Sequence, residues 1–259
     1  MKRLLAALLS LVLVLVGVGG AVATTSSATT FGAANPGRIG PVDVERVYKN
    51  LPRNWDRVTQ QSVVSFKLPP RKVNAGRYDR MLRTWFRTAP NYRIWYAYWH
   101  EAENDMTTPA RQRAYRNAWK HIVKIERATG RNRLFSTIVL MNYTLQPASN
   151  RTITDYYPGD KWIDVVAFDG FNWDYYREYR TPGEIYGAGY RWARQHNKPY
   201  ASAEWGSAVI AGDTQGRARW IRAAGRWFSN RNARFATYWN NEKFAVTDRP
   251  SLRAVRSLM

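Results

Sequence analysis

The sequence predicts an α/β fold, specifically a single-domain (β/α)8 TIM barrel, and three observations support this prediction. Short runs rich in β-branched and aromatic residues alternate with longer stretches in which apolar residues recur at helical spacing. Several of the short runs are apolar at consecutive positions, as expected for parallel strands covered on both faces. Eight such runs suit the length of the chain, which favours a closed barrel. A doubly wound open sheet is the alternative.

The predicted strands share this enrichment, and most of them end in polar groups. In chain order they are Thr30–Ala34, Glu45–Lys49, Ser62–Leu68, Arg93–His100, Leu134–Asn142, Trp162–Phe171, Pro199–Glu204 and Arg234–Trp239. In a barrel of this kind, functional groups gather at the carboxyl ends of the strands. The residues that close each run are therefore the first candidates for a functional site.

Longer segments between these strands carry the spacing of amphipathic helices. They are Tyr78–Phe86, Pro109–Thr129, Thr181–Gln195 and Gly216–Ser229. The second segment places its apolar residues on one face: Tyr115, Ala118, Trp119, Ile122 and Ile125. Gly130 then ends this helix. No helical pattern separates the first two strands.

The N-terminus has the pattern of an export signal. Lys2 and Arg3 precede the apolar run Leu4–Val18, and Ala21-Val22-Ala23 forms a small-x-small cleavage site. We therefore predict a signal peptide over residues 1–23, a Ser/Thr-rich spacer over residues 24–30 and the barrel domain over residues 31–259, in a secreted protein. An uncleaved membrane anchor is the alternative, because the apolar run is just long enough to span a bilayer.

The composition narrows the classes of site and partner. Without cysteine, the chain has neither disulfides nor cysteine-ligated zinc, and with only three histidines we expect no metal and no cofactor. The net charge of +21 raises nucleic acid as a partner. However, the basic residues are scattered singly and in pairs, so we expect no nucleic acid and instead an association with an anionic cell wall. We expect a monomer.

Three carboxylates stand out because they interrupt or close apolar strands. Glu101 follows the fourth predicted strand, Asp169 lies inside VVAFDGFNW, and Glu204 closes PYASAEWGS. A buried carboxylate costs desolvation free energy unless it is paired or used. The small residues before Glu204 leave room inside a barrel, while Trp205 and Gly206 after it provide an aromatic wall and a tight turn.

Two carboxylates in an aromatic cleft suit the hydrolysis of a glycosidic bond. One carboxyl must be protonated to give a proton to the leaving oxygen, and the other must be ionised to attack the anomeric carbon. Glu101 ends the fourth strand and Glu204 the seventh, so their carboxyls face each other across the barrel mouth. This arrangement allows the separation of roughly 5 Å that a retaining enzyme requires. The sequence contains 12 Trp and 16 Tyr, which can form core or line a sugar site.

These segments together resemble glycoside hydrolase family 26. The resemblance rests on His100-Glu101, on YYPGDKWIDVVAFDGFN and on SAEWGS, and it runs from about Arg93 to Trp239. It implies a (β/α)8 barrel that hydrolyses β-glycans with retention, most typically as an endo-β-1,4-mannanase. It further implies Glu101 as the acid/base, preceded by the family's histidine at His100, and Glu204 as the nucleophile.

The chain departs from the family pattern at two places. The family usually has Tyr after Asp-Gly in the sixth strand, where its hydroxyl contacts the nucleophile, but here the position is Phe171. The hydroxyl would then have to come from Tyr143 or Tyr238. The residues after Glu101 are Ala-Glu-Asn-Asp, which differ from the family's mannanases, so we expect a different adjoining sugar subsite.

Further residues near the strand ends are candidates for contact with the sugar chain. They are His100, Glu103, Asn142, Asp169, Phe171, Trp173, Trp205 and Trp239. Each has a structural alternative: packing for the aromatic residues, solvation for Glu103, and bracing of the fold for Asp169. Two other functions stay open, a non-catalytic carbohydrate-binding barrel of the cell wall, favoured by Phe171, and a basic nucleic-acid binder.

Overall fold

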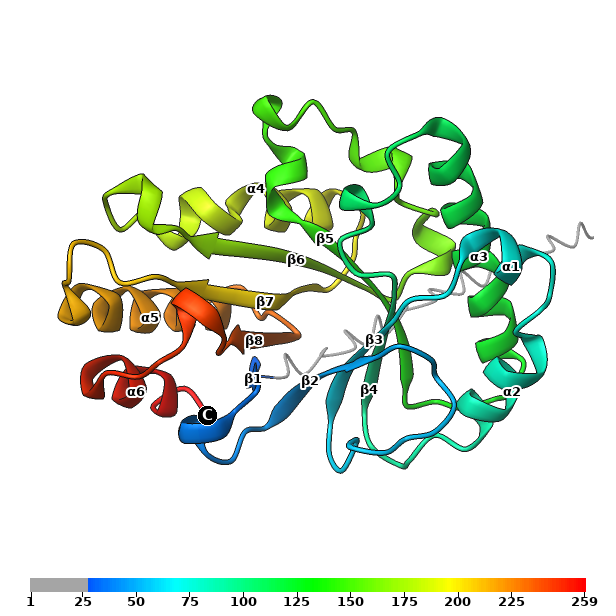
Figure 1. The fold of residues 1–259 in the computed structure, drawn as a ribbon, viewed down its shortest axis with the longest axis horizontal. Coiled ribbons are helices and arrows are strands. Elements are labelled where there is room, and N and C mark those ends of the chain that lie inside the picture. Colours follow the sequence, from blue (N-terminus) through cyan, green and yellow to red (C-terminus); the bar gives the residue numbers. More distant parts are fainter. Residues whose placement is uncertain (1–27) are drawn as a thin grey trace, which may run out of the picture.

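Eight parallel strands close into a barrel in the order β1 to β8, which confirms the predicted (β/α)8 TIM barrel and excludes the open sheet. The computed structural model describes residues 28–259 (Figure 1). The strands are β1 Thr30–Ala34, β2 Val44–Lys49, β3 Ser62–Phe66, β4 Ile94–Tyr98, β5 Leu134–Met141, β6 Val165–Asn172, β7 Tyr200–Ser207 and β8 Phe235–Trp239. The predicted signal peptide and most of the predicted spacer lie outside the described residues.

The helices lie outside the ring of strands (Figure 1). They are α1 Pro70–Asn74, α2 Asp79–Arg87, α3 Pro109–Arg127, α4 Pro182–Gln195, α5 Thr214–Ser229 and α6 Arg249–Arg256. The sequence pattern missed α1 and α6, because both are too short to show a long apolar stripe. As expected, β1 and β2 are joined without an α-helix, through a single 3-10 turn at Gly37–Ile39. No helix among residues 28–259 is long and apolar enough to cross a membrane.

Side-chain caps fix the points at which the loops of the barrel mouth turn into helices. Thr108 caps α3 by accepting a hydrogen bond from the backbone N–H of Arg111. Thr181 and Glu184 form a reciprocal capping box at the start of α4. Asp213 and Asp248 cap α5 and α6 by accepting hydrogen bonds from the backbone N–H groups of Gly216 and Ser251. The loops that follow β4, β6, β7 and β8 are therefore anchored where they leave the mouth.

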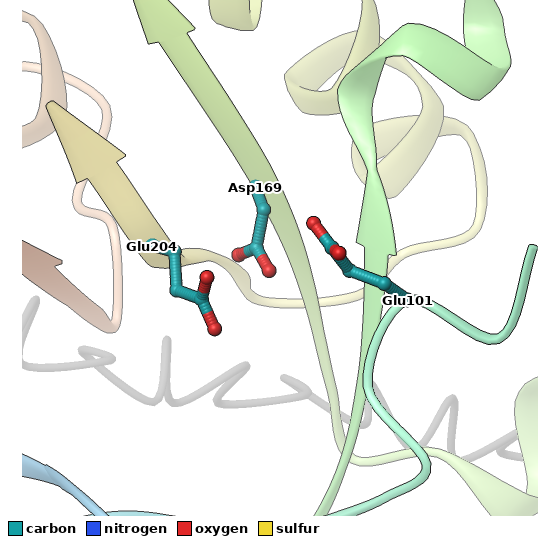
Figure 2. A group of neighbouring side chains, drawn as sticks. All are labelled: Glu101, Asp169 and Glu204. Atoms are coloured by element: carbon teal, nitrogen blue, oxygen red, sulfur yellow. The ribbon is translucent and has the colours of Figure 1, made fainter. Parts of the chain in front are cut away.

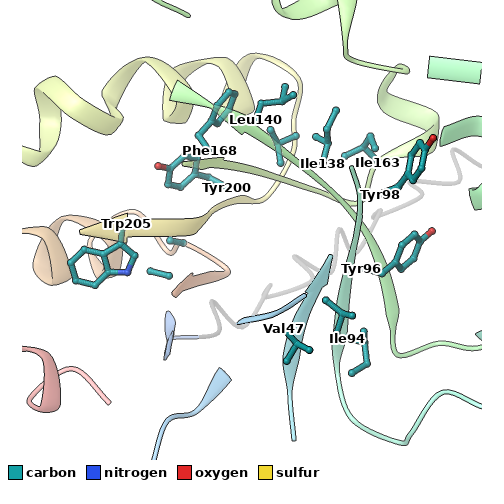
Figure 3. Close-up of a cluster of buried hydrophobic side chains, with 14 of the residues drawn as sticks. Val47, Ile94, Tyr96, Tyr98, Ile138, Leu140, Ile163, Phe168, Tyr200 and Trp205 are labelled. Carbon is teal, nitrogen blue, oxygen red and sulfur yellow. The ribbon is translucent and has the colours of Figure 1, made fainter. Parts of the chain in front are cut away.

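The core consists of two layers separated by the strands. Outward side chains such as Ile94, Tyr96 and Tyr98 pack beneath the helices (Figure 3). The alternate residues of β4, Trp95 and Ala97, belong to the second cluster, which fills the barrel interior. Trp95 thus packs in the barrel interior and not under the helices, because the period of two places it on the inner face.

A bulge in β7 decides which side chains face the mouth. Ala201 and Ala203 face the barrel interior, so regular alternation would place Trp205 next on that face. Just before Trp205, however, β7 contains one residue more than the matching stretches of β6 and β8. The extra residue directs Glu204 inward and turns Trp205 out into the helix layer.

Candidate active site

The carboxyl groups of Glu101, Asp169 and Glu204 converge at the mouth of the barrel. One carboxylate oxygen of each lies within 4.8 Å of one oxygen of each of the others. Glu101 follows β4, Asp169 lies on β6 and Glu204 on β7, and the three side chains point toward one another with Asp169 between the two glutamates (Figure 2). The structure thus brings together the three carboxylates that stood out in the sequence.

The turn after β4 holds Glu101 in an unusual backbone conformation. Trp99 and Glu101 both have left-handed φ angles, +53° and +50°. Two backbone hydrogen bonds fix this turn: Trp99 N donates to Phe66 O of β3 (2.8 Å), and Glu101 N donates to Val139 O of β5 (2.9 Å). Left-handed residues outside glycine occur where the surroundings impose them, often at functional sites. Here the neighbouring strands on both sides impose it.

The Glu204 carboxylate is held by two residues of β2. The Tyr48 hydroxyl donates a hydrogen bond to Oε1 of Glu204 at 2.6 Å, and Arg46 Nη2 forms an ion pair with the same oxygen at 3.2 Å. The Arg46 side chain is fully buried, and its guanidinium lies 4.2 Å from the centre of the Tyr48 ring. A charge this deeply buried requires a partner. Glu204 is that partner.

Sequence reasoning missed Arg46 and Tyr48. It proposed that Tyr143 or Tyr238 would supply the hydroxyl that Phe171 lacks, and this was wrong. The Tyr143 hydroxyl donates to Ala148 O, and the Tyr238 hydroxyl donates to Phe244 O. The available signal was the alternation in β2, where Val44, Arg46 and Tyr48 share the inward face.

Two of the three carboxyl groups, those of Glu101 and Asp169, have a raised pKa. Burial, followed by the negative charges of Glu204 and Glu103, raises the pKa of Glu101 to about 7. Burial and the charges of the two glutamates raise the pKa of Asp169 well above its usual value. Neither oxygen of Asp169 finds a hydrogen-bond partner of good geometry among the described residues. Asp169 therefore holds a proton more readily than an exposed carboxyl group does.

His100 lies beside the acids as an uncharged ring. Burial, followed by the charges of Arg46 and Lys67, lowers the pKa of His100 to about 2. Its ring meets that of Tyr48 edge to face, with centroids 5.3 Å apart. A neutral imidazole can donate one hydrogen bond and accept another, which suits contact with a sugar hydroxyl.

The carboxylates open into an aromatic hollow of about 540 Å³. Its aromatic lining comprises Tyr143, Phe171, Trp173, Tyr175, Tyr176, Trp239 and Phe244. Trp173 stacks on Tyr175 with ring centroids 5.6 Å apart, and Phe171 stacks on Phe244 at 4.6 Å. The structure therefore places the predicted contact residues Phe171, Trp173 and Trp239 on the wall of the hollow.

Three predicted contact residues have structural roles instead. Trp205 is fully buried and packs against Tyr238 with ring centroids 5.0 Å apart, so the prediction of substrate stacking was wrong. Glu103 is also buried, and its Oε1 accepts hydrogen bonds from Met141 N (2.8 Å) and Thr144 Oγ1 (2.9 Å). It braces the turn after β4 against the end of β5, contrary to the prediction of a sugar contact.

Asn142 joins the end of β5 to α4. Its amide nitrogen donates to Ile185 O, and its amide oxygen accepts from Gly189 N at 3.0 Å. With 3% of its surface exposed, Asn142 holds the helix against the barrel, and it also forms part of the wall of the hollow.

Among residues 28–259, the three converging carboxyl groups are also the cluster with the right spacing to bind a metal ion. Arg46, however, already brings a buried positive charge to 3.2 Å from Glu204. A second cation at the same oxygens would face this guanidinium at short range. The cluster is therefore better suited to proton transfer and nucleophilic attack than to holding a metal.

The barrel is similar in structure to solved glycoside hydrolases. A family 26 protein from Muricauda sp. MAR_2010_75 superposes with a TM-score of 0.60 over 90% of this chain and 85% of its own, at 12% identity. A family 26 β-mannanase from Bacteroides ovatus gives 0.58 over 89% and 88%, at 13% identity. A family 128 endo-β-1,3-glucanase from Amycolatopsis mediterranei gives 0.54 over 89% and 100%, at 10% identity. These likenesses establish the fold, and the structural resemblance to family 26 is confirmed.

One curated protein is similar in sequence. Endoglucanase H of Acetivibrio thermocellus is 30% identical over 144 residues, which is 51% of this chain and 15% of that protein. The chain thus spans only a small part of the length of this relative. No protein-family model matches the chain.

Proposed function

We propose that this chain is a retaining glycoside hydrolase that cleaves β-glycosidic bonds within a polysaccharide, with an activity like that of an endo-β-1,4-mannanase. The observation that carries the proposal is the pairing of Glu101 with Glu204 at the mouth, with carboxylate oxygens within 4.8 Å. A retaining enzyme needs its two carboxyl groups about 5–5.5 Å apart, whereas an inverting enzyme needs room for a water between them. The short separation supports retention.

In the first step, the Glu204 carboxylate attacks the anomeric carbon while Glu101 gives its proton to the leaving oxygen. A pKa of about 7 keeps Glu101 largely protonated in weakly acidic solution, as this step requires. Tyr48 and Arg46 both bind Oε1 of Glu204. Since no hydrogen bond among the described residues engages Oε2, this oxygen is the one available to attack.

In the second step, water hydrolyses the glycosyl-enzyme. Glu101, now ionised, takes a proton from the water as its oxygen attacks the anomeric carbon, and Glu204 leaves as a carboxylate. The aromatic rings along the hollow, Trp173 and Trp239 among them, stack on the apolar faces of successive sugar rings. The family 26 and family 128 neighbours and the endoglucanase relative support a β-glycan as the substrate.

The non-catalytic alternative was favoured by Phe171, which lacks the hydroxyl expected beside the nucleophile. Tyr48 supplies such a hydroxyl from β2, 2.6 Å from Glu204, and this removes the main support for that alternative. The nucleic-acid alternative gives no role to the three converging carboxyls. We further propose that the enzyme acts outside the cell, as the N-terminal pattern in residues 1–23 predicts.

The test is a hydrolysis screen on galactomannan, β-1,4-glucan, β-1,3-glucan and xylan with the purified protein. We expect oligosaccharide release from at least one polymer, and a loss of roughly 10³-fold or more in Glu204→Gln. Glu178→Gln, at an exposed residue, is the matched control and should keep full activity. NMR of the first products should show the β-anomer. Undiminished hydrolysis by Glu204→Gln would end the assignment, and an α-anomer would exclude retention.

A further inference from the structure

A second hollow, of about 360 Å³, lies at the opposite end of the barrel from the carboxylates. The residues that line it stand at or just before the amino ends of five strands, β4 to β8. Those used below are Arg93, Trp95, Phe135, Asp164, Lys198 and Arg234. The mechanism proposed for the mouth gives this hollow no role.

Positive charge dominates the lining. Arg93 is exposed, and its guanidinium lies 5.9 Å from the centre of the Trp95 ring and forms no side-chain hydrogen bond or ion pair with any residue in the range 28–259. Lys198 donates to the backbone oxygen of Asp160 at 2.6 Å, which leaves two of its three ammonium hydrogens for other acceptors. Arg234 lines the same hollow as Arg93, and burial, followed by the charge of Arg93, lowers the pKa of Arg234.

The single carboxylate of the lining does not balance these charges. Oδ2 of Asp164 accepts hydrogen bonds from the backbone N and the hydroxyl of Ser136, both at 2.8 Å. Its Oδ1 lies 3.6 Å from Nη2 of Arg127, a cation outside the hollow. Arg93 and Lys198 therefore line the hollow against one carboxylate that is already engaged elsewhere.

Such a cluster is costly at this end of a barrel. The amino-terminal face of this fold ordinarily serves stability, and neighbouring like charges reduce stability. The apolar surfaces of Trp95 and Phe135 beside the cations lower the local dielectric constant. This strengthens the repulsion between the cations, and it also strengthens their attraction for an anion. A bound anion would relieve this repulsion.

We propose that this hollow binds a phosphate group carried by an anionic polymer. The planar guanidinium of Arg93 presents paired N–H donors that match two oxygens of a phosphate, and Lys198 adds a point charge. The hollow, at about 360 Å³, is many times larger than the roughly 30 Å³ that one water occupies in the liquid. It therefore has room for a phosphate group and part of the polymer that carries it. Bound in this way, the barrel keeps its aromatic mouth directed away from the polymer. This proposal does not depend on the glycosidase assignment.

The experiment measures binding of inorganic phosphate and of long-chain polyphosphate by calorimetry, in a phosphate-free buffer at about 0.15 M ionic strength, where charges far from the hollow are screened. We expect both to bind, and Arg93→Gln to weaken binding by about tenfold or more. Arg93→Lys keeps the charge but removes the paired N–H donors of the guanidinium. Its affinity should lie between those of the unaltered protein and Arg93→Gln. Arg113→Gln is the matched control, because Arg113 is exposed in the second turn of α3, near the mouth, and its loss changes the net charge equally. It should change the affinity less than about twofold.

Three results would overturn the proposal. The first is the absence of phosphate binding at millimolar concentration. The second is an equal loss of affinity in Arg93→Gln and Arg113→Gln, which would mean attraction to diffuse charge alone. The third is equally tight, Arg93-dependent binding of polygalacturonate, which would assign the hollow to carboxylates. Circular dichroism of each variant confirms that the comparison is made between folded proteins.

Discussion

The phenolic oxygen of Tyr48 lies 2.6 Å from Oε1 of Glu204 and joins β2 to β7 at the mouth of the barrel. The hydroxyl beside the proposed nucleophile thus comes from the second strand and not from the sixth, where Phe171 stands. Arg46, two residues earlier on the same face of β2, adds its charge to the same oxygen. One strand therefore supplies both groups that bind Oε1 of Glu204.

We predict that Tyr48→Phe lowers kcat/KM by about 10- to 100-fold with little change in folding. The variant removes one hydrogen bond to a charged oxygen, which contributes roughly 1.5–3 kcal/mol, and keeps the ring that packs against His100 and Trp239. The measurement is steady-state hydrolysis of the best polymer from the screen. Tyr92→Phe loses the hydroxyl of an exposed tyrosine in the loop before β4, away from the mouth, and is the control. Equal activity of the two variants would contradict this role for Tyr48.

The pH dependence of kcat/KM should have an alkaline limb near pH 7. Burial and the neighbouring charges raise the pKa of Glu101 to about 7, so the protonated acid disappears as the pH rises through that value. Glu101→Ala should lose this limb. It should also keep more activity on aryl glycosides with good leaving groups, which need no proton, than on polysaccharide. An alkaline limb at pH 7 that persists in Glu101→Ala would show that another group causes it.

Replacing Trp239 should weaken substrate binding, whereas replacing Trp205 should lower the free energy of unfolding. Trp239→Ala is expected to raise KM on polysaccharide several-fold and to change the melting temperature little, because Trp239 lines the hollow. Trp205→Ala should cost about 3–5 kcal/mol of unfolding free energy, because its indole is fully buried in the layer between strands and helices. Thermal unfolding and KM measured on both variants test this contrast. A raised KM at full stability in Trp205→Ala would reinstate the sequence-based prediction.

Glu103→Gln should stabilise the protein at alkaline pH. Burial raises the pKa of Glu103 to about 7, above that of the unfolded chain, so folding takes up a proton between about pH 4.5 and pH 7. This group's contribution to stability is fully present below the unfolded pKa and is lost as the pH rises through 7, at a cost of roughly 3 kcal/mol. The amide oxygen of Gln can still accept from Met141 N and Thr144. Denaturant unfolding at pH 5 and pH 8.5 should show a gain only at the higher pH.

Much of the fold follows from the sequence, because parallel strands buried on both faces have continuous apolar runs that short-range patterns reveal. The same patterns located Glu101 and Glu204 at strand ends. They did not reveal the partners of Glu204, since the pairing of β2 with β7 residues depends on closure of the barrel over more than 150 positions of sequence. Nor did they show that Glu103 and Asn142 are braces, because bracing depends on which backbone groups lie opposite.

The one extra residue of β7 determines which side chains face the mouth of the barrel. Side chains alternate along a strand, so in a regular strand Trp205 would share the inward face of Ala201 and Ala203, and Glu204 would face outward. The indole would then occupy the mouth, and the carboxylate would lie among the aromatic rings beneath α5. The one extra residue, accommodated as a bulge, therefore decides whether the mouth holds converging carboxylates or a blocking indole.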